Sequence, residues 1–201
     1  MLVATELATK KHARIAKTII NDAYRVGESG ILLDTKEDPL QRVTSDDVMN
    51  MIESQQLLVL KIKEDGDQDE VIVGCVKAEM VKQQKDGTEK NIVEWGCLAV
   101  AESYQGKGYG NRLVLAVEDY IRTTLKCKTA QLELLAPSSW KHAHKERLRD
   151  WYKRLGYTLK VPDDYKASTM SLPTGSVLAD RFFLITDADF TCYQKQLSQI
   201  I

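Results

Sequence analysis

The sequence predicts a mixed α/β (α+β) fold, in which a twisted, mostly antiparallel sheet is flanked by helices. Three observations indicate this class. Extended apolar segments joined by turns run from Leu57 to Val100, as in an antiparallel meander. A glycine-rich loop and a helical pattern follow, and a further apolar strand at Thr129–Leu135 completes a strand-helix-strand unit. Such a crossover should be right-handed, with its two strands parallel.

The composition predicts one domain that spans residues 1–201, since the chain is long enough to bury a single sizeable core. The net charge of -1 provides no overall field for nucleic acid, and no apolar run reaches the roughly 20 residues that cross a bilayer. The four cysteines show no paired spacing, which indicates reduced thiols. We therefore expect a cytoplasmic protein, with the nucleus as the alternative, and neither a nucleic-acid nor a membrane partner.

The residues ahead of the meander are predicted to form one strand and two helices. Leu2–Leu7 is apolar and extended, and Lys10–Tyr24 carries apolar residues at helical spacing. Thr44 begins a capping-box pattern, with Asp47 three positions on, for a second helix. Residues 25–43 lack periodicity and are expected to form an irregular connection over a ligand.

The meander itself consists of three predicted strands, Leu57–Lys63, Val71–Lys82 and Ile92–Val100. The acidic run at residues 64–70 is interpreted as a solvated turn, because no bidentate acid follows at the spacing of a calcium loop. A hairpin turn at Lys85–Gly87 leads into the third strand.

The C-terminal third is predicted to alternate between helices and strands. Lys145–Leu155 reads as an amphipathic helix that stops at Gly156, and Tyr157–Val161 reads as a strand. The apolar residues of Gly175–Ile185 fall at helical spacing and predict a short helix, and Phe190–Leu197 predicts a closing strand.

A strand-loop-helix unit lies at the centre of this arrangement. It comprises the strand that ends at Val100, the glycine loop Gln105–Gly110 and a helix from about Asn111. Because a helix N-terminus leaves its first amides unpaired and carries partial positive charge, the unit predicts a phosphate site. The loop lacks the Gly-Lys-Ser or Gly-Lys-Thr of a Walker A motif, and no repeated strand-helix units accompany it as in a Rossmann fold. The remaining interpretation is a loop that binds a pyrophosphate through its backbone amides, in a mixed sheet.

Two motifs together carry a resemblance to a known family. The pattern Gln105-x-x-Gly108-x-Gly110 follows a strand, and the run Trp151–Tyr157 comes later in the chain. With the meander, the similarity covers Leu57–Leu159, and the chain resembles the GNAT superfamily of N-acetyltransferases. The resemblance implies a GNAT-like sheet and an acetyl-CoA-dependent N-acetyltransferase.

The resemblance also implies where acetyl-CoA binds. Amides of the loop would hold its pyrophosphate, and its extended pantetheine arm would pair with the strand backbone as an added strand does. No metal is expected. The cofactor-binding residues expected on this basis are Leu98, Ala99, Val100, Gln105, Gly106, Lys107, Gly108, Tyr109, Gly110 and Asn111.

Transfer of an acetyl group to an amine needs a group that removes a proton, because an aliphatic ammonium of pKa about 10.4 is mostly protonated at neutral pH. Glu94 is the candidate base, since it is an acid in an otherwise apolar strand, where some relatives carry a glutamate. Tyr152 matches the tyrosine that in many relatives protonates the departing thiolate. The alternatives are a strand glutamate paired with a lysine and a core tyrosine on an amphipathic helix.

The acetyl acceptor is less well defined by the sequence. The expected substrate contacts are Tyr24, Glu28, Leu33 and Trp140, the first three because the corresponding region faces the substrate in many relatives. A small-molecule primary amine, attacked directly in a ternary complex, is favoured because no basic tail or reader motif is present. The alternatives are a protein lysine or N-terminal acetyltransferase and a weakly catalytic CoA-binding interaction module. A homo-oligomer is compatible with the sequence.

Three further features are interpreted as structural. The segment Ala136–Trp140 departs from the family, because relatives often carry an Asn early in this segment, and the sequence therefore does not support that contact. His142 and His144 are expected on the surface, since a zinc site would need further Cys or His ligands nearby. Cys97 is expected to be a buried small hydrophobe, not a nucleophile.

Overall fold

The computed structural model describes most of the chain, namely residues 2–35, 37, 39–63, 69–81, 91–161 and 168–197. The strands in this part are β1 (Leu2–Leu7), β2 (Leu57–Lys63), β3 (Val71–Met80), β4 (Ile92–Val100), β5 (Thr129–Pro137), β6 (Thr158–Leu159), β7 (Thr169–Leu172), β8 (Val177–Leu178), β9 (Phe182–Phe183) and β10 (Ala188–Gln196). The helices are α1 (Ala13–Gly27), α2 (Ser45–Glu53), α3 (Tyr109–Thr123) and α4 (Ala143–Arg154), with short 3-10 turns at Lys10–His12 and Glu102–Tyr104.

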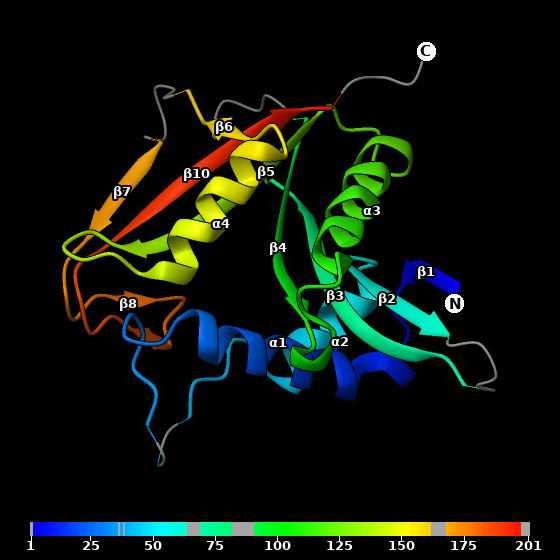
Figure 1. Cartoon of the computed structure of the whole chain (residues 1–201), viewed down its shortest axis with the longest axis horizontal. Coiled ribbons are helices and arrows are strands. Elements are labelled where there is room, and N and C mark those ends of the chain that lie inside the picture. Colours follow the sequence, from blue (N-terminus) through cyan, green and yellow to red (C-terminus); the bar gives the residue numbers. More distant parts are fainter. Residues whose placement is uncertain are drawn as a thin grey trace.

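The main sheet has the strand order β1-β2-β3-β4-β5-β10-β6, and β7 also pairs with β10 (Figure 1). Every neighbouring pair in it is antiparallel except β4 and β5, which run parallel and are joined through α3. The predicted mixed, mostly antiparallel sheet with one strand-helix-strand crossover is confirmed.

Helices cover both faces of this sheet (Figure 1). The apolar side of α3 packs on one face, beside α4, and the apolar sides of α1 and α2 pack on the other. Full burial of one such aliphatic side chain stabilises the fold by about 2 kcal/mol, so these stripes hold the helices in place. The residues that α3 buries recur at helical spacing and are Leu113, Val114, Val117 and Ile121.

Local signals in the sequence placed several element ends correctly. Thr44 and Asp47 form the predicted capping box, in which the Thr44 amide donates to Asp47 Oδ2 (2.8 Å) and the Asp47 amide donates to Thr44 Oγ1 (3.1 Å). The helix after the glycine loop begins at Tyr109, two residues earlier than predicted. Gly156, which follows α4, has a φ of 89°, the left-handed conformation typical of a glycine after a helix.

The predicted helix at Gly175–Ile185 is wrong. This segment forms the hairpin β8-β9, because Ala179 and Asp180 both adopt positive φ angles (49° and 58°) and reverse the chain. The hairpin packs on the connection between α1 and α2 through a bridge between Leu32 and Leu184. The predicted strand at Tyr157–Val161 is shortened to β6. The hairpin turn at residues 85–87 and most of the acidic run lie outside the described residues.

Candidate active site

Strands β4 and β5 pair only at their beginnings. The parallel ladder contains three residue pairs, from Ile92 with Thr129 to Glu94 with Gln131, and the strands then separate (Figure 1). From Trp95 to Val100, β4 has no strand partner on this side among the described residues. We call this stretch the open edge of β4. Its unpaired backbone groups can bind an extended ligand as an added strand.

A β-bulge in β4 contributes to this separation. Cys75 pairs with Ala99 and Lys77 pairs with Gly96, so that two residues of β4, Cys97 and Leu98, lie opposite a single residue of β3. Cys97 has a φ of 49°, which is uncommon for a residue with a side chain. A bulge bends its strand and increases the local twist, which directs β4 away from β5.

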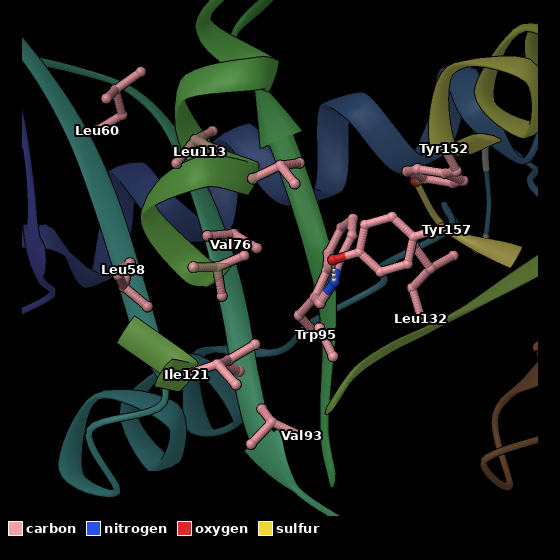
Figure 2. Close-up of a cluster of buried hydrophobic side chains, with 14 of the residues drawn as sticks. Leu58, Leu60, Val76, Val93, Trp95, Leu113, Ile121, Leu132, Tyr152 and Tyr157 are labelled. Atoms are coloured by element: carbon pink, nitrogen blue, oxygen red, sulfur yellow. Dashed lines mark hydrogen bonds between the residues drawn. The ribbon is translucent and has the colours of Figure 1, made fainter. Parts of the chain in front are cut away.

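Aromatic side chains pack between β4 and β5 where these two strands separate. The rings of Tyr152 and Tyr157 each lie 5.7 Å from the Trp95 ring, edge to face. Figure 2 shows these three residues, the aromatic group, beside β4 with Leu132 of β5 below them. Trp95 Nε1 donates to the Tyr157 hydroxyl (2.8 Å), which in turn donates to Glu118 Oε1 (2.9 Å). The aromatic group therefore fixes Tyr152 next to the first residue of the open edge.

The loop after β4 forms an amide cradle over residues 105–111. Gly106 and Gly108 adopt positive φ angles of 73° and 82°, and α3 begins directly after them. A Cβ atom built on either glycine would meet no atom within 4 Å. No described residue accepts a hydrogen bond from the backbone amides of Gly106, Lys107, Gly108, Gly110 or Asn111. Free amides at a helix N-terminus fit the pyrophosphate of acetyl-CoA.

Side chains of the amide cradle hold it against its neighbours. Gln105 Nε2 donates to the carbonyl oxygen of Val100 (3.0 Å), which ties the loop to the end of β4. Asn111 Oδ1 accepts from Trp151 Nε1 (2.7 Å), which ties α3 to α4. Lys107 Nζ lies 5.0 Å from the centre of the Tyr104 ring. The side chains of Gln105 and Asn111 thus position the loop, and the backbone amides are left for a ligand.

Tyr152 lies on the buried side of α4 and is 7% exposed. Burial raises the pKa of its phenol, and the nearby carboxylate of Glu28 raises it further. The phenol therefore keeps its proton at neutral pH, as a proton donor must.

Glu28, at the end of α1, forms a buried ion pair with Lys145 of α4. Glu28 Oε1 lies 2.6 Å from Lys145 Nζ, and both residues are at most 5% exposed. The sequence reasoning missed Lys145, although its spacing to Leu148 and Tyr152 places all three on one face of the helix. The pair joins helices on opposite faces of the sheet beside the open edge.

Tyr24 lies one turn before Glu28 on α1 and is half-buried. Burial raises the pKa of its phenol; nearby Cys97, Tyr152 and Glu28 raise it further, whereas Arg42 lowers it. Tyr24, Glu28 and Tyr152 are therefore close enough to influence one another electrostatically. Burial also raises the pKa of the Cys97 thiol, in agreement with a structural rather than a nucleophilic role.

A known family covers the segment that carries the open edge, the amide cradle and Tyr152. The family model of the acetyltransferase (GNAT) family matches residues 18–157. This chain belongs to the GNAT family. It is accordingly an acetyl-CoA-dependent N-acetyltransferase, as the resemblance of its two motifs implied.

Solved structures share this GNAT fold over nearly the whole chain. An N-acetyltransferase from Staphylococcus aureus superposes with a TM-score of 0.62 at 15% identity, covering 98% of this chain and 100% of that one. The protein yncA from Salmonella typhimurium, solved with its cofactor acetyl-CoA, has a TM-score of 0.60 at 21% identity, with coverage of 98% and 95%. A ribosomal-protein-alanine N-acetyltransferase from Brucella melitensis has a TM-score of 0.60 at 16% identity, with coverage of 98% and 100%. The comparison with curated proteins gives no match.

In this GNAT chain Glu94 occupies the last paired position before β4 and β5 separate. Its Oε2 accepts a hydrogen bond from Gln131 Nε2 (2.9 Å), and Gln131 Oε1 accepts one from Gln194 Nε2 (2.8 Å). Side chains alternate along a strand, so Glu94 and Trp95 point to opposite faces of the sheet. Glu94 therefore lies on the α1 face, whereas Tyr152 approaches from the α4 face.

The remaining substrate candidates of the GNAT chain lie further from this centre. Leu33 is 40% exposed, and its amide donates to the carbonyl oxygen of Phe183 (2.9 Å) in the hairpin. Trp140 stacks on His142 with 5.4 Å between ring centres, and it lies against Gly30 at the end of α1. The structure thus groups Trp140 with the end of α1 and Leu33 with the hairpin.

The two histidines of this region are half-buried, in contrast to the expected surface positions. His142 Nε2 lies 3.2 Å from the carbonyl oxygen of Ser29, and His144 packs against Gly27. Burial lowers the pKa of His144, and the positive charge of Lys145 lowers it further. Both histidines therefore help to fix α4 on the end of α1.

Two features are absent from the described part of the GNAT chain. No group of three or more His, Cys, Asp or Glu side chains is arranged to hold a metal ion. None of the helices is both long enough and apolar enough to span a membrane.

Proposed function

We propose that this acetyltransferase transfers the acetyl group of acetyl-CoA to the primary amine of a small molecule, by direct attack in a ternary complex. One observation carries the proposal: the open edge of β4 connects the amide cradle to Tyr152. Val100 at one end is hydrogen-bonded to Gln105, and Trp95 at the other end packs on Tyr152. At about 3.3 Å per residue this edge is roughly 17 Å long, enough for an extended arm.

Residues of the chain are proposed to bind the cofactor through their backbone. The free amides of the cradle described above hold the pyrophosphate, whereas the Gln105 amide donates to the carbonyl oxygen of Glu102 (3.1 Å). The backbone of Leu98, Ala99 and Val100 pairs with the amide groups of the pantetheine arm. The cofactor supplies a thioester carbon that an amine can attack.

The proton transfers are assigned to two side chains. Glu94 accepts the proton of the acceptor amine, directly or through water, since only the free amine is a nucleophile. Tyr152 holds a proton on its phenol oxygen and donates it to the departing thiolate. Its place beside Trp95, at the first residue of the open edge, supports this role.

A small acceptor is supported by the enclosure of the residues that would meet it. Glu28 and Tyr152 are only 5% and 7% exposed. A flexible small amine reaches such groups more readily than a side chain on the surface of a folded protein does. The Brucella melitensis relative is, by its name, a ribosomal-protein-alanine N-acetyltransferase. A protein acceptor is therefore the alternative.

A panel of polyamines, arylalkylamines, amino acids and peptides, each incubated with acetyl-CoA, tests this proposal. We expect a small amine to be acetylated with a kcat/KM about tenfold or more above that of any peptide, a difference of about 1.4 kcal/mol in transition-state stabilisation. The measurements are release of the CoA thiol and the mass of the acetylated product. Preference for a peptide would overturn the small-molecule acceptor. Binding of CoA without acetylation of any amine would instead indicate an interaction module.

Replacing Glu94 by glutamine should lower kcat/KM about 30-fold at neutral pH, because the variant lacks the base but keeps an acceptor oxygen for Gln131. The loss is measured with the best amine of the panel over a range of pH. The matched control is Glu79→Gln, since Glu79 lies directly opposite Glu94 on β3 and pairs with Lys77. Equal rates for the Glu94→Gln variant and the wild type would remove Glu94 from the mechanism.

A further inference from the structure

Arg42 lies in the connection between α1 and α2, and its guanidinium stacks on two aromatic rings. It lies 4.9 Å from the centre of the Tyr24 ring and 5.4 Å from that of Phe182, and its residue is half-buried. No ion pair among the described residues includes it. An unpaired charge in such a place costs desolvation energy that a bound anion would offset.

Two other arginines of this region, Arg181 and Arg25, do form ion pairs. Arg181 stacks on the same Phe182 ring at 4.9 Å, but its Nη1 donates to Asp47 Oδ2 (2.8 Å). Arg25 lies 3.8 Å from Asp34 and 3.4 Å from Asp22. Arg42 alone of these three therefore has a guanidinium that is free for a carboxylate.

The position of Arg42 ties it to the reaction centre. Its guanidinium is close enough to Cys97, which lies in the bulge of the open edge, for the two groups to interact electrostatically. The ring that it covers, Tyr24, is close enough to Tyr152 for the two phenols to interact electrostatically. An anion held by Arg42 would thus lie beside the proposed site of acetyl transfer.

The carboxylate of Glu28, which has a free oxygen, interacts electrostatically with Arg42. Glu28 Oε1 accepts from Lys145, but Glu28 Oε2 is buried without a hydrogen-bond partner among the described residues. Tyr24 and Glu28 are four residues apart on α1 and share one face of the helix. The face of Tyr24 is therefore flanked by an unpaired cation and by an unsatisfied carboxylate oxygen.

We propose that the acceptor is a small amine that also carries a carboxylate, such as an amino acid. Arg42 binds the carboxylate, and Glu28 Oε2 receives the amine from the side of Tyr152. A guanidinium and a carboxylate can form two parallel charge-assisted hydrogen bonds, which gives orientation as well as affinity. Arg42, Lys145 and Glu28 together carry one net positive charge, which favours an acceptor with an anionic group over a plain amine. This inference rests on the proposed function.

Pairs of acceptors that differ only in the carboxylate test the inference, for example L-phenylalanine with 2-phenylethylamine and L-methionine with 3-(methylthio)propylamine. The wild type should prefer the carboxylate member by about 30-fold in kcat/KM, the value of one strong charge-assisted contact. In Arg42→Gln this preference should vanish, because the KM of the carboxylate member should rise about 30-fold relative to that of the plain amine. Arg42→Lys should restore part of it.

Arg181→Gln is the matched control, because Arg181 stacks on the same ring while its guanidinium is already paired, and it should keep the preference. A further test uses wild-type protein and so does not depend on the folding of a variant. In it, 3-phenylpropionate, which is L-phenylalanine without its amino group, should inhibit competitively against the acceptor amine. Acetylation of both members at equal rates, or no inhibition by the acid, would overturn the inference and leave the proposed function intact. Failure to acetylate any amine would instead count against the proposed function.

Discussion

Replacing Gly108 by valine should raise the Kd for CoA about 100-fold, a loss of about 2.7 kcal/mol of binding free energy. Gly108 has a φ of 82° at the start of α3, and a Cβ there would project into space that no described atom occupies within 4 Å. The free amides of Gly106, Lys107 and Gly110 lie within two residues of this position along the chain. A branched side chain would block their approach to a phosphate and would strain the loop. Isothermal titration with CoA measures the effect.

Gly175→Val separates the two effects of the Gly108 variant, namely blocked approach of a phosphate and strain in the loop backbone. Gly175 has a φ of 86° and likewise no atom within 4 Å of its added Cβ, but it lies in the turn before β8, away from the cradle. The two variants should lose similar thermal stability, because the backbone cost is the same, and only Gly108→Val should lose CoA. Binding that survives in Gly108→Val would show that the cofactor does not use these amides.

Replacing Tyr152 by phenylalanine should lower kcat about 100-fold to 1,000-fold, the range of a lost proton donor, and leave the KM for acetyl-CoA nearly unchanged. The ring is retained, so its contact with Trp95 should survive. Steady-state kinetics with the best acceptor, and thermal unfolding, give the two readouts. Because burial raises the pKa of the phenol, the wild type should show no loss of activity from ionisation of Tyr152 up to about pH 10, the ordinary value.

Tyr157→Phe is the control for this experiment. It removes a hydroxyl from the same aromatic group, together with the hydrogen bonds to Trp95 and Glu118. This variant should lose about 1 to 3 kcal/mol of stability with little change in kcat, because buried polar groups are left unpaired. If both variants kept the wild-type kcat, Tyr152 would be a core tyrosine, as the alternative interpretation of the sequence holds.

The parts of the molecule that could be predicted from the sequence depend on neighbouring residues. The capping box at Thr44 and the glycine after α4 are local signals. The hairpin β8-β9 was not predicted, because the residues with positive φ angles in its turn are Ala179 and Asp180. Glycine, the usual sequence signal of such a turn, is at neither position. In so short an apolar segment, helical and extended spacing cannot be told apart.

The site was only partly predictable, because some of its groups acquire their role through distant contacts. Lys145 meets a partner that is 117 residues away in the chain, and a lysine in a helix normally indicates a solvated surface. Arg42 lies in a segment without periodicity, so no pattern points to its two aromatic neighbours. The bulge at Cys97 directly follows Gly96, so a glycine within the strand was a local signal for it. The cradle could be predicted, since its glycines lie within a few residues of the helix they precede.

The short ladder between β4 and β5 has a mechanical consequence. With only three residue pairs in common, the sheet consists of two halves. The aromatic group fastens the halves on one face, and the ion pair of Glu28 with Lys145 fastens α4, on that face, to α1 on the other. An acceptor that binds Glu28 would therefore change the position of α4, the helix that carries Tyr152, through the ion pair with Lys145. We expect the affinities for acceptor and cofactor to be thermodynamically linked, each ligand changing the affinity for the other by the same factor.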